Sequence, residues 1–242
     1  MNTHSPVDGS LLQDVTTESL IERIVNIIHL AEIYSEPSEN IYIENVFPEN
    51  IYKELIMSLP DLKDLDPIDH PAAIKKDGSV TRYLLDITPS TLSRLGIKNR
   101  SFWAYIIKVF NSTEISKAIV SKFQKTLLKR FGSDMPEIAA VPIFYRDLPG
   151  YKIGVHADIP TKIATLQFYL PEDNSQMHLG TVFHNRVDRK QLKKNKFIPN
   201  SAYAFVRTDE SWHSVDILGP LEKPRNSIAL TLYIKGHEYI SV

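Results

Sequence analysis

A histidine and an aspartate separated by one residue, His156-Ala157-Asp158, are the first residues in this sequence that could do chemistry together. The residues around them predict an extended segment, in which side chains two positions apart point to the same side. One imidazole and one carboxylate placed in this way can bind a single metal ion. Two ligands leave the site incomplete, so a second imidazole must come from another strand.

Among the later histidines, His213 is the favoured second imidazole, because it follows the predicted strand Ala202–Arg207. His178 and His184 lie in a predicted connection between strands, where exposed histidines are expected, and His237 follows the last predicted strand. Two imidazoles and one carboxylate on one face of a metal ion form the facial triad of non-haem Fe(II) oxygenases. This triad leaves coordination positions open for a chelating 2-oxo acid and for O₂.

A basic residue opens the last long predicted strand. Arg225 precedes the strand Ser227–Ile234, and Ser227 shares its face because it is two residues further on. A buried guanidinium suits a carboxylate, since its N–H groups match both oxygens. The alternative is that Arg225 forms a surface salt bridge.

The ordered set of H-x-D, a distal histidine and a basic residue on the next strand resembles the Fe(II)/2-oxoglutarate-dependent oxygenases, in particular the prolyl 4-hydroxylase-like branch. The resemblance is strongest from about residue 140 to 233. It implies a double-stranded β-helix, or jelly roll, in which His156, Asp158 and His213 bind Fe(II). It further implies that Arg225 pairs with the distal carboxylate of 2-oxoglutarate, where many members of this branch use lysine. The implied reaction takes O₂, hydroxylates an unactivated C–H bond and releases succinate and CO₂.

Three further residues resemble cosubstrate contacts of this family: Tyr145 on the strand before the metal segment, Thr165 in Thr165-Leu166-Gln167-Phe168, and Ser227 in the R-x-S pattern. Core packing or ordinary strand filling is the alternative for each. The family's halogenases have a small residue in place of the carboxylate, so the presence of Asp158 favours hydroxylation or a related oxidation.

The sequence does not identify the substrate, and it leaves alternatives open for both the substrate and the class of protein. A small molecule or an amino acid is favoured over a peptidyl, prolyl-type substrate, because no peptide-binding extension is evident. A non-catalytic jelly-roll binding protein is an alternative from another class. A cupin-type metalloenzyme is disfavoured, because the H-x-H pair followed by a nearby glutamate is absent.

The segments that must position these residues have a helical pattern in the first part of the chain and a strand pattern in the second. Apolar residues recur at helical spacing early in the sequence, and Gly132 ends the helical pattern. Strand-like segments rich in β-branched and aromatic residues follow, which predicts an α+β fold with an antiparallel sandwich or barrel braced by N-terminal helices. The predicted helices are 20–31, 48–59, 102–110 and 115–131, and the predicted strands are 41–46, 80–87, 140–146, 161–170, 202–207 and 227–234.

One domain is predicted after a loose tail of residues 1–15. Residues 16–242 form the oxygenase domain, with helical support over about 16–132 and a jelly-roll core over about 139–242. Residues 186–196 contain six basic side chains and one acid, which predicts either a solvated loop or a lid favouring an anionic substrate.

Composition excludes several other classes of protein. The 242 residues contain no cysteine, so thiol nucleophiles, disulfides and iron–sulfur clusters are absent. The nine glycines form neither G-x-G-x-x-G nor a P-loop. A net charge of −1 disfavours nucleic acid and anionic membranes as partners. No signal or membrane-spanning segment is evident, so a cytoplasmic location is expected, and the oligomeric state stays open.

Overall fold

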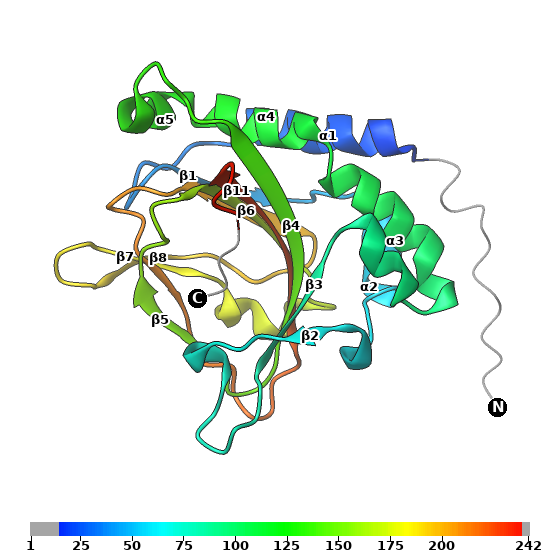
Figure 1. Ribbon diagram of the computed structural model, residues 1–242. Coiled ribbons are helices and arrows are strands. Elements are labelled where there is room, and N and C mark those ends of the chain that lie inside the picture. Colours follow the sequence, from blue (N-terminus) through cyan, green and yellow to red (C-terminus); the bar gives the residue numbers. More distant parts are fainter. Residues whose placement is uncertain (1–14, 239–242) are drawn as a thin grey trace, which may run out of the picture.

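Two antiparallel sheets form the framework of the computed structural model, which describes residues 15–238 (Figure 1). The larger sheet has seven strands and the smaller has four. The predicted α+β class is confirmed. In spatial order the large sheet contains β1 (Asn40–Glu44), β9 (Ser201–Val206), β6 (Lys162–Tyr169), β11 (Arg225–Ile234), β4 (Ile138–Asp147), β3 (Arg82–Asp86) and β2 (Asp66–Pro67), and the small sheet contains β5 (Ile153–His156), β10 (His213–Val215), β7 (Val182–His184) and β8 (Gln191–Lys194).

Helices from the first half of the chain cover one side of the large sheet. Figure 1 shows α1, α4 and α5 in one layer, with α2 and α3 beside it. The side chain of Thr16 caps α1 by accepting a hydrogen bond from the Ser19 backbone N–H. The helices are α1 (Thr17–Leu30), α2 (Glu49–Met57), α3 (Ile97–Phe110), α4 (Thr113–Lys122) and α5 (Gln124–Phe131), with 3₁₀ turns η2 (Leu62–Asp64), η3 (Pro71–Ala73), η4 (Pro89–Ser93) and η5 (Asn174–Leu179).

Alternation along the central strand β11 separates the apolar core from the site. Ile228 and Leu230 face the helices and are fully buried in the main hydrophobic cluster. Arg225, Ala229 and Thr231 point the other way and line a cavity between the two sheets. This two-residue period is the geometry of a pleated strand, and it places polar side chains on one face only.

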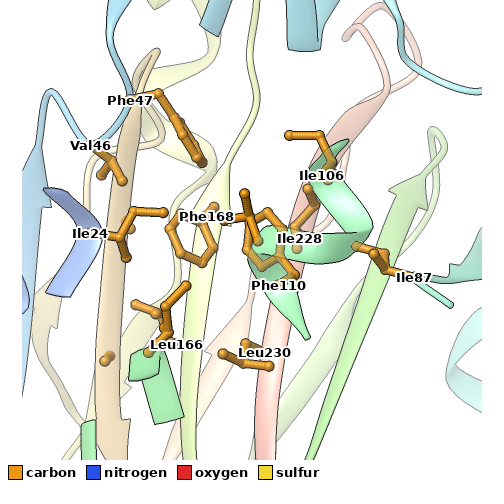
Figure 2. Packing of buried hydrophobic residues seen from close by; sticks show 14 of the residues in the cluster. Ile24, Val46, Phe47, Ile87, Ile106, Phe110, Leu166, Phe168, Ile228 and Leu230 are labelled. Atoms are coloured by element: carbon orange, nitrogen blue, oxygen red, sulfur yellow. The ribbon is translucent and has the colours of Figure 1, made fainter. Parts of the chain in front are cut away.

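The core between helices and sheet fixes the position of the strands that carry the site (Figure 2). Phe110 of α3 packs edge-on against Phe168 of β6, with ring centroids 5.0 Å apart. Both rings are buried, and burying one phenylalanine contributes about 1.5–3 kcal/mol. The apolar face of β6 is therefore held by the helices, while Thr165 and Gln167 on its other face line the cavity.

The N-terminal half contributes strands as well as helices. The predicted strands 41–46 and 80–87 become β1 and β3 of the large sheet, and β2 adds a short edge strand that was not predicted. Of the predicted tail, residues 1–14 lie outside the described residues, as do the last four of the predicted domain. Among the described helices, none is both long and apolar enough to cross a bilayer.

The region predicted as a connection around His184 is in fact a β-hairpin. β7 pairs with β8, and the turn between them contains Val187, which is 89% exposed. The expectation of an exposed histidine is wrong for His184, which is only 8% exposed because β7 lies inside the small sheet beside β10. β7 has three residues, and an alternating pattern cannot be recognised in so short a strand.

Candidate active site

Two side chains of the small sheet and one from the segment after β5 meet in one place. His156 ends β5 and His213 begins β10, and the two residues face each other across the strand pair. Their ring centroids are 4.3 Å apart. Asp158 follows β5, and one ligand atom from each of the three residues lies within 4.8 Å of the others. The structure thus brings together the His-Asp-His set that was selected from the sequence.

Backbone carbonyls set the tautomer of both histidines. The Nδ1 atom of His156 is 3.0 Å from the Gly154 carbonyl oxygen, and the Nδ1 atom of His213 is 3.0 Å from that of Ser211. A carbonyl can only accept, so each Nδ1 carries the hydrogen and each Nε2 keeps its lone pair for a metal. Burial lowers the pKa of His213 to about 4, which keeps its imidazole neutral at physiological pH.

The carboxylate of the set is held by a lysine that the sequence analysis did not select. Asp158 is 8% exposed, and the Lys162 Nζ lies 2.8 Å from its Oδ1. Burial opposes ionisation of Asp158, but the charge of Lys162 and its hydrogen bond to the carboxylate hold the pKa of Asp158 below the usual value. An ionised Asp158 beside two imidazoles that each offer an Nε2 atom is a donor set that suits a divalent transition metal.

The predicted arginine is buried with one edge of its guanidinium free. Arg225 is 1% exposed, and its Nη1 donates to the Asp147 Oδ2 at 2.8 Å. Its Nε and Nη2 are buried and have no hydrogen-bond partner. These two N–H groups point from the same edge, the arrangement that binds both oxygens of a carboxylate. A buried donor without a partner is costly, so this edge calls for an anionic ligand.

The free edge of Arg225 and the His-Asp-His set line the same cavity. The cavity has a volume of about 130 Å³. Tyr145 of β4 and Thr165 of β6 also line it. Ser227 lies behind the lining, where its hydroxyl accepts from the Gln167 Nε2 at 2.8 Å. Gln167 is thus the side chain that faces the cavity at this point, and Ser227 orients it.

A second arginine, which the sequence analysis missed, completes a row across three strands. Arg82 of β3 and Arg225 of β11 are both register partners of Asp147 on β4. The Arg82 Nε lies 3.1 Å from the Asp147 Oδ1 as an ion pair, although its angle is not that of a hydrogen bond. The Arg82 guanidinium also lies over the rings of Tyr145 and Tyr151, 4.2 and 4.6 Å from their centroids.

A wider cleft adjoins the inner cavity. It has a volume of about 660 Å³, and the segment from Asp66 to Ala73 forms its outer wall. Arg82, Tyr145 and Lys162 line the cleft and the inner cavity alike, as do two of the candidate metal ligands. A molecule in the cleft therefore lies beside two of the candidate metal ligands, and the volume is in the range of small-molecule sites.

The rival features of the sequence lie elsewhere. His178 pairs with Glu222 at 2.5 Å, and both ring nitrogens of His184 have partners, so neither joins the metal set. In the basic segment 186–196, Arg186 pairs with Glu210 and Arg189 lies on the Trp212 ring. The described lining of the cleft and the cavity includes no residue of this segment. The proximity that a lid requires is therefore not seen in this structure.

No family model matches the sequence, and no curated protein matches it. Solved structures do match the fold. A prolyl 4-hydroxylase from Phytophthora capsici is 14% identical with a TM-score of 0.57, over 89% of this chain and 65% of its own. A Pseudomonas putida prolyl-4-hydroxylase is 15% identical with a TM-score of 0.53, over 90% of this chain and 100% of its own.

A third match is a prolyl hydroxylase from Trichoplax adhaerens, solved in complex with a peptide fragment of the hypoxia inducible factor oxygen degradation domain. It is 15% identical with a TM-score of 0.51, and the match covers 94% of each chain. Likenesses at this identity establish the fold. The chain therefore has the double-stranded β-helix fold of the prolyl 4-hydroxylase-like oxygenases, as the sequence resemblance predicted.

Proposed function

We propose that the protein is an Fe(II)- and 2-oxoglutarate-dependent oxygenase that hydroxylates a C–H bond of a small molecule, with succinate and CO₂ as co-products. The observation that carries this proposal is the free, buried edge of Arg225 in the same cavity as His156, Asp158 and His213. The Arg225 edge suits a carboxylate, and the two imidazoles and the Asp158 carboxylate suit Fe(II). 2-Oxoglutarate has a distal carboxylate for the first and a chelating end for the second.

The residues of the chain perform three tasks in this proposal. His156 and His213 offer Nε2 and Asp158 offers a carboxylate oxygen, which leaves the remaining positions of the metal open. When bound, Fe(II) with 2-oxoglutarate and O₂ supplies the oxidising power for breaking an unactivated C–H bond. Arg225 orients 2-oxoglutarate by binding its distal carboxylate. The rings of Phe183 and Phe205 lie beside His213 and keep bulk water away from the ligands.

The size of the outer cleft supports a small molecule as the substrate. A volume of about 660 Å³ falls within the range of pockets that enclose small ligands. The second candidate is a peptidyl substrate, which the peptide-bound Trichoplax adhaerens structure with the same fold supports. A jelly roll that binds ligands without turnover is the third, and the complete ligand set counts against it.

Anaerobic titration of the metal-free protein tests the proposal. Fe(II) is added first and 2-oxoglutarate second, while the visible metal-to-ligand charge-transfer absorption is recorded. The proposal expects an absorption band that saturates at one equivalent of each, and succinate release after admission of O₂. Iron binding without the band would overturn the oxygenase function and leave the fold with a binding role.

Replacing Arg225 by glutamine should raise the KM for 2-oxoglutarate by about 10- to 100-fold, because hydrogen bonds to a charged group contribute about 1.5–3 kcal/mol. Iron affinity should stay within about twofold, since Arg225 is not among the candidate ligands. Succinate release at varied cosubstrate concentration gives the KM. Arg146→Gln is the matched control, because Arg146 is on β4 and its Nε donates instead to Asn226. An unchanged KM in Arg225→Gln would remove its assigned role.

A further inference from the structure

The buried charges around the two cavities do not cancel. Within residues 15–238, the cations in this region are Arg82, Arg225 and Lys162, and they are paired with two buried carboxylates, those of Asp147 and Asp158. Ligating histidines count as neutral. Fe(II) and the 2-oxoglutarate dianion would cancel each other, so one positive charge remains when both are bound. Buried charge without a counter-charge is unfavourable, so the loaded site favours one more anion.

The cations that can meet this anion are Arg82 and Lys162. Their side chains are 19% and 25% exposed, so both are largely desolvated and still accessible from the cleft. The Arg82 Nε faces Asp147 and its Nη1 donates to the Tyr151 hydroxyl, while its Nη2 has no hydrogen-bond partner among the described residues. The Lys162 ammonium has three N–H donors, and within the described part of the chain it donates a hydrogen bond to Asp158.

The outer rim of the cleft does not neutralise these two cations. Asp66 is already paired with Arg94 at 2.6 Å. Asp69 is exposed, so solvent and salt screen its charge. The attraction for an anion therefore increases from the rim toward Arg82 and Lys162, where water is scarce.

We propose that the substrate carries a carboxylate, which Arg82 Nη2 and Lys162 Nζ bind where the cleft meets the inner cavity. This inference rests on the proposed function and narrows its substrate to small organic acids, amino acids included. Because the Lys162 Nζ is 2.8 Å from a candidate metal ligand, a carboxylate bound to it places its neighbouring carbons beside the metal. An internal residue of a peptide lacks this backbone carboxylate, which disfavours a prolyl-type substrate.

A neutral isostere tests the proposal without knowledge of the natural substrate. The probes are propionate and propionamide, which have the same shape and differ in charge. The protein is loaded with Mn(II) and saturating 2-oxoglutarate, and loading is verified by calorimetry. The relaxation enhancement of each probe's methyl protons by Mn(II) is then measured by NMR across a concentration series. Failure of 2-oxoglutarate to bind would contradict the proposed function, separately from this inference.

With the loaded protein, propionate should show saturable relaxation enhancement and propionamide should bind at least about tenfold more weakly. Lys162→Gln and Arg82→Gln should each weaken propionate by about tenfold and leave propionamide unchanged. Lys152→Gln is the matched control, because Lys152 is exposed and lines neither cavity. Equal binding of the two probes, no enhancement of either, or propionate binding that both variants leave unchanged would overturn the inference.

Discussion

His213→Ala should abolish metal binding and 2-oxoglutarate turnover. The substitution removes one of two imidazoles, and the remaining pair, His156 and Asp158, cannot hold a transition metal tightly. Loss of groups that merely orient a ligand costs about 10- to 100-fold in metal affinity, so loss of a ligand should cost more than about 100-fold. Equilibrium dialysis with Co(II) measures the affinity, and succinate release measures the turnover.

His184→Ala is the control for this prediction. His184 is also a buried imidazole of the small sheet, with its Nε2 bound to the Ser214 hydroxyl at 2.7 Å. Both variants remove a side chain of the same volume from the same region, so a general loss of packing would affect both. Only His213→Ala should lose the metal. Retention of Co(II) by His213→Ala, or equal loss in both variants, would show that His213 is not a ligand.

Asp147→Ala should reduce the free energy of unfolding by about 3–5 kcal/mol, because it leaves two buried guanidinium groups without their shared anion. Asp147 is 0% exposed and lies between Arg82 and Arg225 on adjacent strands. Removal of the carboxylate also removes the group that holds the Arg225 Nη1 and presents its free edge to the cavity. Urea unfolding followed by circular dichroism gives the free energy.

A surface aspartate provides the comparison for Asp147. Asp209 pairs with Arg207 at 3.0 Å but is 69% exposed, so Asp209→Ala should cost no more than about 1 kcal/mol. Asp147→Asn keeps the shape of the side chain and removes the charge, which separates the electrostatic effect from the cavity. If Asp147→Ala were no more destabilising than Asp209→Ala, the buried charge row would have no structural role.

The candidate metal set could be predicted from the sequence because its strongest signal is local. His156 and Asp158 are two residues apart, and an extended backbone is enough to bring them to one side. His213 required a guess at strand order, which the β5–β10 pairing supports. Arg225 was found from its place at the start of the last long strand, and the structure buries it as expected.

Arg82, Asp147 and Lys162 could not be assigned roles from the sequence. The row through Arg82 and Asp147 exists only because β3 pairs with β4 in one register, and a shift of one residue would turn Arg82 to the other face. Lys162 reaches Asp158 across a turn, where no regular period relates two side chains. The contacts of these three residues thus depend on how distant segments pair, which a local sequence pattern does not show.

The same distinction explains the other differences. Long strands such as 140–146 and 227–234 were recognised from their composition, since β-branched and aromatic residues dominate them. The β7–β8 hairpin was missed because three of the four residues in its second strand, Gln191–Lys194, are polar and resemble a loop. This segment is a strand because it pairs with β7, and its own residues do not have a strong strand propensity.

The anchoring of the two imidazoles has a consequence for how this site changes over evolutionary time. Both Nδ1 atoms are held by main-chain carbonyls, those of Gly154 and Ser211, and a main-chain carbonyl is present whatever the side chain. A point substitution at either position leaves the anchor in place, provided that the strand keeps its path. The neighbouring sequence can therefore drift extensively while the ligands keep their orientation. Similarity to known folds at 14–15% identity, without a matching family model, is what such drift would leave.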